Sequence, residues 1–158
     1  MSKSLRLETL MEGCGGTDAK ACYHAYFLCF NDARYYEAHD VLEYAWLKLS
    51  PAEGMFFKGL IQLAGAFVHL QKQYLRPYHY KFGGRLRPAK RLFWVASKNL
   101  HPYFPKHMGL DVAVALKVCE FLEGKIAASG YQYNPWRPEN APYFEEKADM
   151  WYLRMRGV

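Results

Sequence analysis

Three side chains have the types from which a small polar or metal-binding site could be built: His39, Glu43 and His69. His39 and Glu43 are one helical turn apart, so on a helix they lie on the same face. Two imidazoles and a carboxylate are ligands that zinc and similar divalent metals accept. The same groups, with Gln62 as a hydrogen-bonding neighbour, can also form a satisfied polar network inside a helical protein.

The absence of known catalytic patterns argues against several reaction classes. The HExxH and ExxH spacings of helical metal sites do not occur, no serine lies in a nucleophile elbow, and no glycine-rich loop follows a strand. We therefore favour the structural network and expect no cofactor. A small-ligand pocket and a metal site made by His39, Glu43 and His69 remain as alternatives.

A second set of candidates lies in a basic block. No acidic residue occurs between Glu53 and Asp111, and the interval carries the cations Lys58, Lys72, Arg76, Lys81, Arg85, Arg87, Lys90, Arg91, Lys98 and Lys106. A block of one sign can favour an anionic partner. The candidate anion-binding residues are Arg76, Lys81, Arg85, Arg87, Lys90 and Arg91.

The block could bind a ligand or serve only the fold. As a binding surface, the pair Gly83-Gly84 before a basic helix could hold an anion. The interleaved aromatic residues Tyr74, Tyr78, Tyr80 and Phe82 could stack on single-stranded bases. We favour the structural interpretation, in which the cations meet carboxylates of the flanking helices and the aromatic side chains pack over the preceding helix.

That preceding helix, predicted over about residues 52–73, is the element around which the others are expected to pack. Its stretch between Lys58 and Lys72 is uncharged and apolar nearly all round, which is typical of a helix in the middle of a domain. Gln62 and His69 lie about 20° apart on its helical wheel. Gly65 and Ala66 between them would allow a close helix contact, so we predict that His39, Glu43, Gln62 and His69 meet there.

Apolar residues recur at helical spacing in most of the remaining chain. The pattern predicts helices from a cap at Thr17 or Asp18 to about Phe30, from about Arg34 to Leu49 with Asp40 on the outer side, from Arg85 or Pro88 to Leu100, and from a cap at Asp111 to about Ala128. Residues 74–84 are expected to be a loop and 101–109 a connector. Phe144, Ala148, Trp151 and Met155 are spaced as one face of a last helix. The predicted fold class is all-α, a compact array of about five to six helices in a single domain, 1–158.

Composition sets the broader expectations. The net charge is +6, and the cysteines Cys14, Cys22, Cys29 and Cys119 form no CxxC pair. This pattern favours a reducing cytoplasm over a zinc or disulfide framework. The N-terminal residues lack the apolar core of a secretory signal, and no stretch is long enough to be expected to span a membrane.

Three segments carry a resemblance to a known family: 30–46 (FNDARYYEAHDVLEYAW), 57–69 (FKGLIQLAGAFVH) and 103–112 (YFPKHMGLDV). They resemble DUF309, a family of small helical proteins, and the resemblance covers about residues 23–122. It implies a compact multi-helical array and no assigned activity. Its motif positions are carried over here as Glu37, His39, Glu43, Trp46, Gly59, Gln62 and His69.

The chain departs from the family pattern in two places. The usual turn glycine is replaced around Ala33-Arg34, and a short basic turn after the central helix is expanded into residues 74–84. The C-terminal extension, residues 131–158, lies outside the resemblance.

Three interpretations of function follow from these observations. We favour a non-enzymatic binding protein whose partner is a protein or small ligand. Its candidate polar cluster is Glu37, His39, Glu43, Trp46, Gln62 and His69. The alternatives are an enzyme of unassigned reaction that uses His39, Glu43 and His69, and a nucleic-acid-associated protein that uses residues 72–98. The sequence leaves the oligomeric state open.

Overall fold

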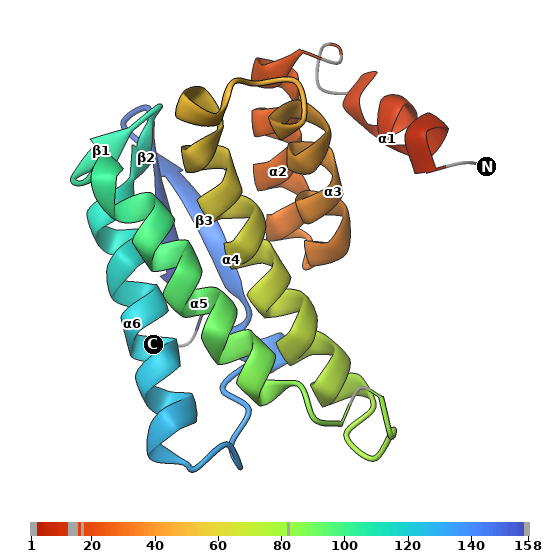
Figure 1. The fold of residues 1–158 in the computed structure, drawn as a ribbon, viewed down its shortest axis with the longest axis vertical. Helices are drawn as coiled ribbons and strands as arrows, with labels where there is room; N and C mark the ends of the chain where they lie inside the picture. Colours follow the sequence, from red (N-terminus) through yellow and green to blue (C-terminus); the bar gives the residue numbers. More distant parts are fainter. Residues whose placement is uncertain (1–2, 13–15, 17, 82, 157–158) are drawn as a thin grey trace.

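The computed structural model describes residues 3–12, 16, 18–81 and 83–156, and its elements are shown in Figure 1. The helices are α1 (Lys3–Glu12), α2 (Ala19–Asn31), α3 (Tyr35–Trp46), α4 (Pro51–Leu75), α5 (Leu86–Leu100) and α6 (Val112–Ala128), with short 3-10 turns at His101–Tyr103 and Pro138–Asn140. The strands are β1 (Lys106–His107), β2 (Leu110–Asp111), β3 (Pro142–Lys147) and β4 (Met150–Met155).

The predicted helix starts at two aspartates are confirmed. The Asp18 carboxylate accepts a hydrogen bond from the Ala21 amide at 2.8 Å and caps α2. Asp111 does the same for α6, accepting from the Val114 amide at 2.8 Å. Each carboxylate satisfies an amide that has no partner within the helix. The alternative cap, Thr17, lies outside the described residues.

α4 is the central helix, as predicted, and extends slightly beyond the expected 52–73. It packs between α3 and α5 (Figure 1). Gly59 explains how α5 comes so close, because a Cβ added there would lie 2.8 Å from Leu100 Cγ. The Phe30 ring of α2 contacts rings of three other elements: Tyr35 at 5.1 Å, Phe67 at 5.5 Å and Phe144 at 4.7 Å. This aromatic centre joins α2, α3, α4 and β3.

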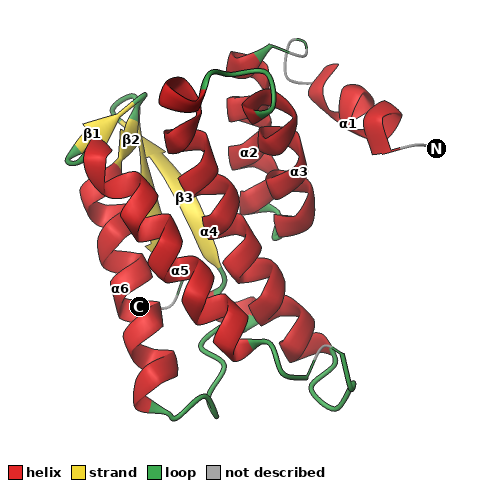
Figure 2. Ribbon diagram, in the orientation of Figure 1, coloured by secondary structure: helices red, strands yellow, loops and turns green. Residues whose placement is uncertain are grey.

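The all-α prediction is wrong, because the described residues also form a four-stranded mixed sheet in the order β1-β2-β4-β3. β3 pairs antiparallel with β4, β1 pairs antiparallel with β2, and β2 runs parallel to β4 at Leu110 and Trp151. Figure 2 shows the β3–β4 hairpin behind α4 and α5. It contacts α2 on one side and α6 on the other. The predicted connector 101–109 contains β1 and leads into β2.

The last helix predicted from Phe144, Ala148, Trp151 and Met155 is instead this hairpin. Ala148 and Asp149 adopt positive φ angles of 52° and 62°, so the chain reverses where a helix would have continued. The hairpin is held because it covers the aromatic face of α2. The Phe27 ring stacks on Trp151 at 4.5 Å and meets Phe144 edge-on at 4.8 Å.

Asn31 closes the outer edge of β3. Its side-chain amide donates to the Phe144 carbonyl at 2.9 Å, and its carbonyl oxygen accepts from the Phe144 amide at 2.6 Å. One side chain thereby takes the place of a neighbouring strand on an edge that would otherwise expose backbone groups. Within the described residues, no helix has the length and apolar character needed to cross a membrane.

Candidate functional site

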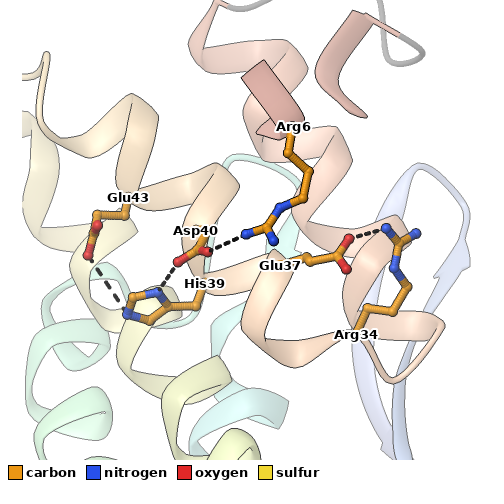
Figure 3. Close-up of polar contacts among 6 residues, drawn as sticks. All are labelled: Arg6, Arg34, Glu37, His39, Asp40 and Glu43. Atoms are coloured by element: carbon orange, nitrogen blue, oxygen red, sulfur yellow. Dashed lines mark hydrogen bonds and ion pairs between the residues drawn. The ribbon is translucent and has the colours of Figure 1, made fainter. Parts of the chain in front are cut away.

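His39 lies between two carboxylates of its own helix, as Figure 3 shows. Its Nδ1 is 3.1 Å from Asp40 Oδ1, and its Nε2 is 3.9 Å from Glu43 Oε2. The side chains of His39 and Glu43 are 32% and 33% exposed, so this part of the predicted cluster is half-buried and reaches the surface. An imidazole between two carboxylates can carry a proton or pass one between them.

Asp40 is the residue of this group that sequence reasoning missed, since its spacing placed it on the outer side of α3. It is only 2% exposed, and the Arg6 guanidinium of α1 lies 3.7 Å from its Oδ2 (Figure 3). A buried carboxylate needs such partners, because burial of an unpaired charge is costly. The sequence did contain a signal that α1 packs against the core: Leu7 and Met11 are one helical turn apart, and both are buried. A packed α1 is what brings Arg6 to Asp40.

Glu37 is directed away from this group. It forms an ion pair with Arg34 at the start of α3 (Figure 3). Its hydrogen bond raises the pKa of Arg34. Trp46 lies at the other end of α3, where Lys58 Nζ is 5.9 Å from its ring and a cavity of about 280 Å³ opens beside Leu47 and Met55. The cluster residues that belong to α3 are therefore spread along the helix.

Gln62 and His69, the two residues of the predicted cluster that lie on α4, have partners on the α5 side of the helix. Gln62 Oε1 accepts a hydrogen bond from Asn99 Nδ2 at 2.7 Å. His69 Nδ1 lies 3.2 Å from Arg85 Nη1. His39 does reach α4, because a Cβ added to Gly65 would lie 4.0 Å from His39 Cδ2. The four residues predicted to meet are therefore divided into an α3 group, formed by His39, Asp40 and Glu43, and two separate pairs, Gln62 with Asn99 and His69 with Arg85.

His69 is a neutral imidazole at pH 7. Its pKa is lowered from 6.5 to about 4, first by burial and then by the positive charges of Arg85 and Lys72. Arginine carries only donors, so Nδ1 of His69 must accept the bond and the proton must lie on Nε2. Arg85 is itself held in place, since its Nε donates to the Lys81 carbonyl at 2.9 Å.

The metal alternative does not fit this arrangement. Among the residues that the structure describes, no three His, Cys, Asp or Glu side chains are grouped so that they could hold a metal ion. His39, Glu43 and His69, the candidate ligands of this alternative, are not among such a group. The Arg85 guanidinium beside Nδ1 also opposes a cation at His69.

The candidate anion-binding residues separate into two locations. Arg76, Lys81 and Arg85 belong to the loop after α4, whereas Arg87, Lys90 and Arg91 lie on α5. The expectation that cations meet carboxylates of flanking helices is confirmed at Lys90, whose Nζ lies 3.4 Å from Glu123 Oε1. The amide of Arg85 donates to Gln73 Oε1 at 2.7 Å, so it is not available to an anion held by Gly83-Gly84.

The loop aromatic residues do not all pack over α4 as expected. Tyr78 and Tyr80 are 99% and 92% exposed, whereas the Tyr74 ring lies 5.4 Å from that of Trp136. The remaining residue of this set, Phe82, lies outside the described part of the chain. The expectation is therefore wrong for Tyr78 and Tyr80, whose side chains are exposed instead of packed on α4.

One side of α5 combines cations with aromatic rings. We call it the α5 face: Arg87, Arg91, Trp94 and Lys98, with Tyr131 beside them. The four α5 residues recur at helical spacing, and Trp94 is 46% exposed. The Arg87 guanidinium lies 3.9 Å above the Tyr131 ring, and Lys98 Nζ lies 4.1 Å above Trp94. A cavity of about 310 Å³ opens here, lined by Arg87, Lys90, Arg91, Trp94, Glu123 and Tyr131.

The charges of this face are open to a partner. In the described ranges of the chain, no carboxylate forms an ion pair with Arg87, Arg91 or Lys98. Sequence reasoning named the two arginines but missed Trp94 and Tyr131. The spacing of Arg87, Arg91, Trp94 and Lys98 could have revealed Trp94. Tyr131, with a positive φ of 65° after α6, gave no such signal.

Comparison with known proteins adds one finding. No curated protein and no solved structure matches the chain. Residues 23–79, which run from α2 through α4 into the following loop, match the family DUF309, described as a domain of unknown function. The matched part contains His39, Glu43, Gln62 and His69, and it ends before the α5 face. Over residues 23–79, the resemblance to DUF309 that the sequence motifs indicated is confirmed.

Proposed function

We propose that this protein is a non-enzymatic binding domain whose partner is an acidic segment of another protein, held on the α5 face. The observation that carries the proposal is the cavity of about 310 Å³ between Arg87, Arg91, Trp94 and Tyr131. Tryptophan, tyrosine and arginine are the side chains most enriched where binding energy is concentrated in protein interfaces. Here they line one hollow, and two of them are already stacked on each other.

The chemistry of the cavity suits an acidic protein segment. Arg87 and Arg91 can each bind a carboxylate through two parallel hydrogen bonds. Trp94 and Tyr131 offer apolar area to a neighbouring side chain of the same segment. Glu123 also lines the cavity, but its carboxylate is paired with Lys90, so the positive charges of Arg87 and Arg91 face an anionic segment.

The α3 group supports a structural role more than a catalytic one. Asp40 is buried and is shared by His39 and Arg6, so the group links α3 to α1. His69 is fixed against Arg85 through the nitrogen that would otherwise accept a proton. These contacts support a scaffold whose polar residues position helices, with binding at the exposed α5 face.

The test uses a fluorescein-labelled peptide of alternating glutamate and leucine, with a labelled oligothymidylate as the competing class of ligand. Arg91→Glu should weaken peptide binding about tenfold, which corresponds to about 1.4 kcal/mol. Lys20→Glu makes the same change of charge at an exposed position of α2 and should leave binding nearly unchanged. Fluorescence anisotropy at several salt concentrations measures both.

Two results would overturn the proposal. Equal weakening by Arg91→Glu and Lys20→Glu would show attraction by net charge without a site. Tighter binding of the oligothymidylate than of the peptide at every salt concentration would make the partner a nucleic acid, with the exposed Tyr78 and Tyr80 as stacking residues.

A further inference from the structure

α6 has a second face that is not used by the core. Ala115, Cys119, Leu122 and Ile126 are buried against the rest of the protein. On the opposite side the Phe121 side chain is 47% exposed, although a phenylalanine buried on folding contributes roughly 1.5–3 kcal/mol. Figure 1 shows α6 at the edge of the molecule, with no helix or strand labelled on its outer side.

Two hollows lie on either side of Phe121. One, of about 560 Å³, is lined by α6 alone: Lys117, Glu120, Phe121, Gly124, Lys125 and Ala128. The other, of about 280 Å³, lies between α6 and β4 and includes Val118 and Met155. Gly124 lines the first hollow, and a Cβ added there would meet no atom within 4 Å, so there is open space for a side chain one turn from the Phe121 ring.

We propose that this face binds a second copy of the chain, with the two α6 helices antiparallel about a two-fold axis between Leu122 and Glu123. In a symmetric pair each contact occurs twice, so a projection and a depression on one helix must fit each other. This axis places Phe121 over Gly124 of the second copy. It also places Ala128 opposite Lys117, where a small residue leaves room for the long lysine side chain.

The charges agree with the same register. Glu120 faces Lys125 of the second copy, and the symmetric contact gives a second pair of opposite charges. Both residues are exposed, and in the part of the chain that the structure describes neither takes part in an ion pair. Lys125 Nζ lies 5.4 Å from the Phe121 ring, so the cation is already beside the residue that would be covered.

A second copy fits this face better than an acidic partner or a lipid surface does. Lys117 and Lys125 would attract either of those, but Glu120 lies between them in the same hollow and would repel both. Only a surface that offers a cation opposite Glu120 and an anion opposite Lys125 satisfies the whole pattern. The chain itself offers this surface.

Sedimentation equilibrium from about 1 μM to 1 mM protein tests the proposal, since this range spans the dissociation constants of weak and moderate dimers. We expect the mass to rise with concentration from that of the 18.4 kDa monomer towards twice that value. Phe121→Ala should abolish the rise. Glu120→Lys and Lys125→Glu should each raise the dissociation constant about tenfold, because each creates two repulsive contacts.

The double variant Glu120→Lys/Lys125→Glu provides the decisive control, since it exchanges the charges and should restore dimerisation. All these side chains are exposed, so thermal unfolding at low concentration should be unchanged and will show that the variants fold. A monomer throughout the concentration range would overturn the proposal. So would a dimer that is insensitive to Phe121→Ala, or single reversals that the double variant does not rescue.

Discussion

At the scale of single residues, the arrangement of His69 and Arg85 decides how the polar part of α4 behaves. The 3.2 Å contact between His69 Nδ1 and Arg85 Nη1 is a hydrogen bond only while the imidazole is neutral. Lys72 and Arg85 add positive charge to a partly buried site. Both effects disfavour protonation, so His69 serves here as a hydrogen-bond acceptor rather than as an acid.

This arrangement predicts a pH dependence of stability. The pKa of His69 is about 4 in the folded protein and close to 6.5 in an unfolded chain. Between these values the unfolded chain takes up a proton that the folded chain does not, so stability falls as pH falls. The contribution is complete above pH 6.5 and is lost as the pH approaches about 4.

His69→Gln is the matched variant, because its amide oxygen can still accept from Arg85 but has no proton to bind. Urea unfolding at a series of pH values should show a steeper loss of stability for the wild type than for the variant. Parallel curves for the two proteins would contradict the account, as would an NMR titration of His69 centred near pH 6.5.

At the scale of elements, the helices α2 to α6 could be predicted from the sequence and the hairpin could not. The long apolar run of α4 and the capping residues Asp18 and Asp111 are local signals that tertiary contacts reinforce. Phe144, Ala148, Trp151 and Met155 have helical spacing, but burial alternates along β3 instead. The deciding contacts are with Phe27 of α2, more than a hundred residues away, and spacing along the chain cannot reveal them.

The candidate site shows the same limit. His39 and Glu43 could be placed together because they are one turn apart on one helix. Their relation to Gln62 and His69 depended on which side of α4 faces α3, and both of those residues proved to contact partners on the α5 side. The Asp40 contact with Arg6 depends on how α1 packs, which residue types alone do not determine.

The hairpin turn provides a test at this scale. Ala148 has a positive φ of 52°, a conformation that costs an L-residue roughly 1–2 kcal/mol and glycine almost nothing. Ala148→Gly should therefore raise the free energy of unfolding by up to about 1 kcal/mol. The same substitution at exposed Ala127 in α6 should lower it by about 0.5–1 kcal/mol, since helical backbone favours alanine. Thermal or urea unfolding of the two variants measures both changes. Equal destabilisation by the two substitutions would contradict the positive φ angle at Ala148.

At the scale of the whole molecule, the structure shows where the basic residues of the chain are exposed. Folding carries Arg87, Arg91 and Lys98 to one exposed side of α5, while Lys90 is neutralised by Glu123 and Arg85 turns back to His69. The net charge of +6 is therefore less informative than its concentration beside Trp94 and Tyr131. This surface lies outside residues 23–79, so it is a feature of this chain beyond the matched family segment.

The central claim, that an acidic segment binds at the α5 face, is tested most directly by NMR of the tryptophan indole N–H groups during titration with the glutamate–leucine peptide. The chain has four tryptophans, of which Trp136 is buried, Trp46 and Trp151 are half-buried, and Trp94 lies in the proposed site. We predict a saturable shift of the Trp94 resonance while the other three stay in place. A bound peptide that shifts Trp46 and leaves Trp94 unchanged would contradict the claim and place the site beside α3 and α4.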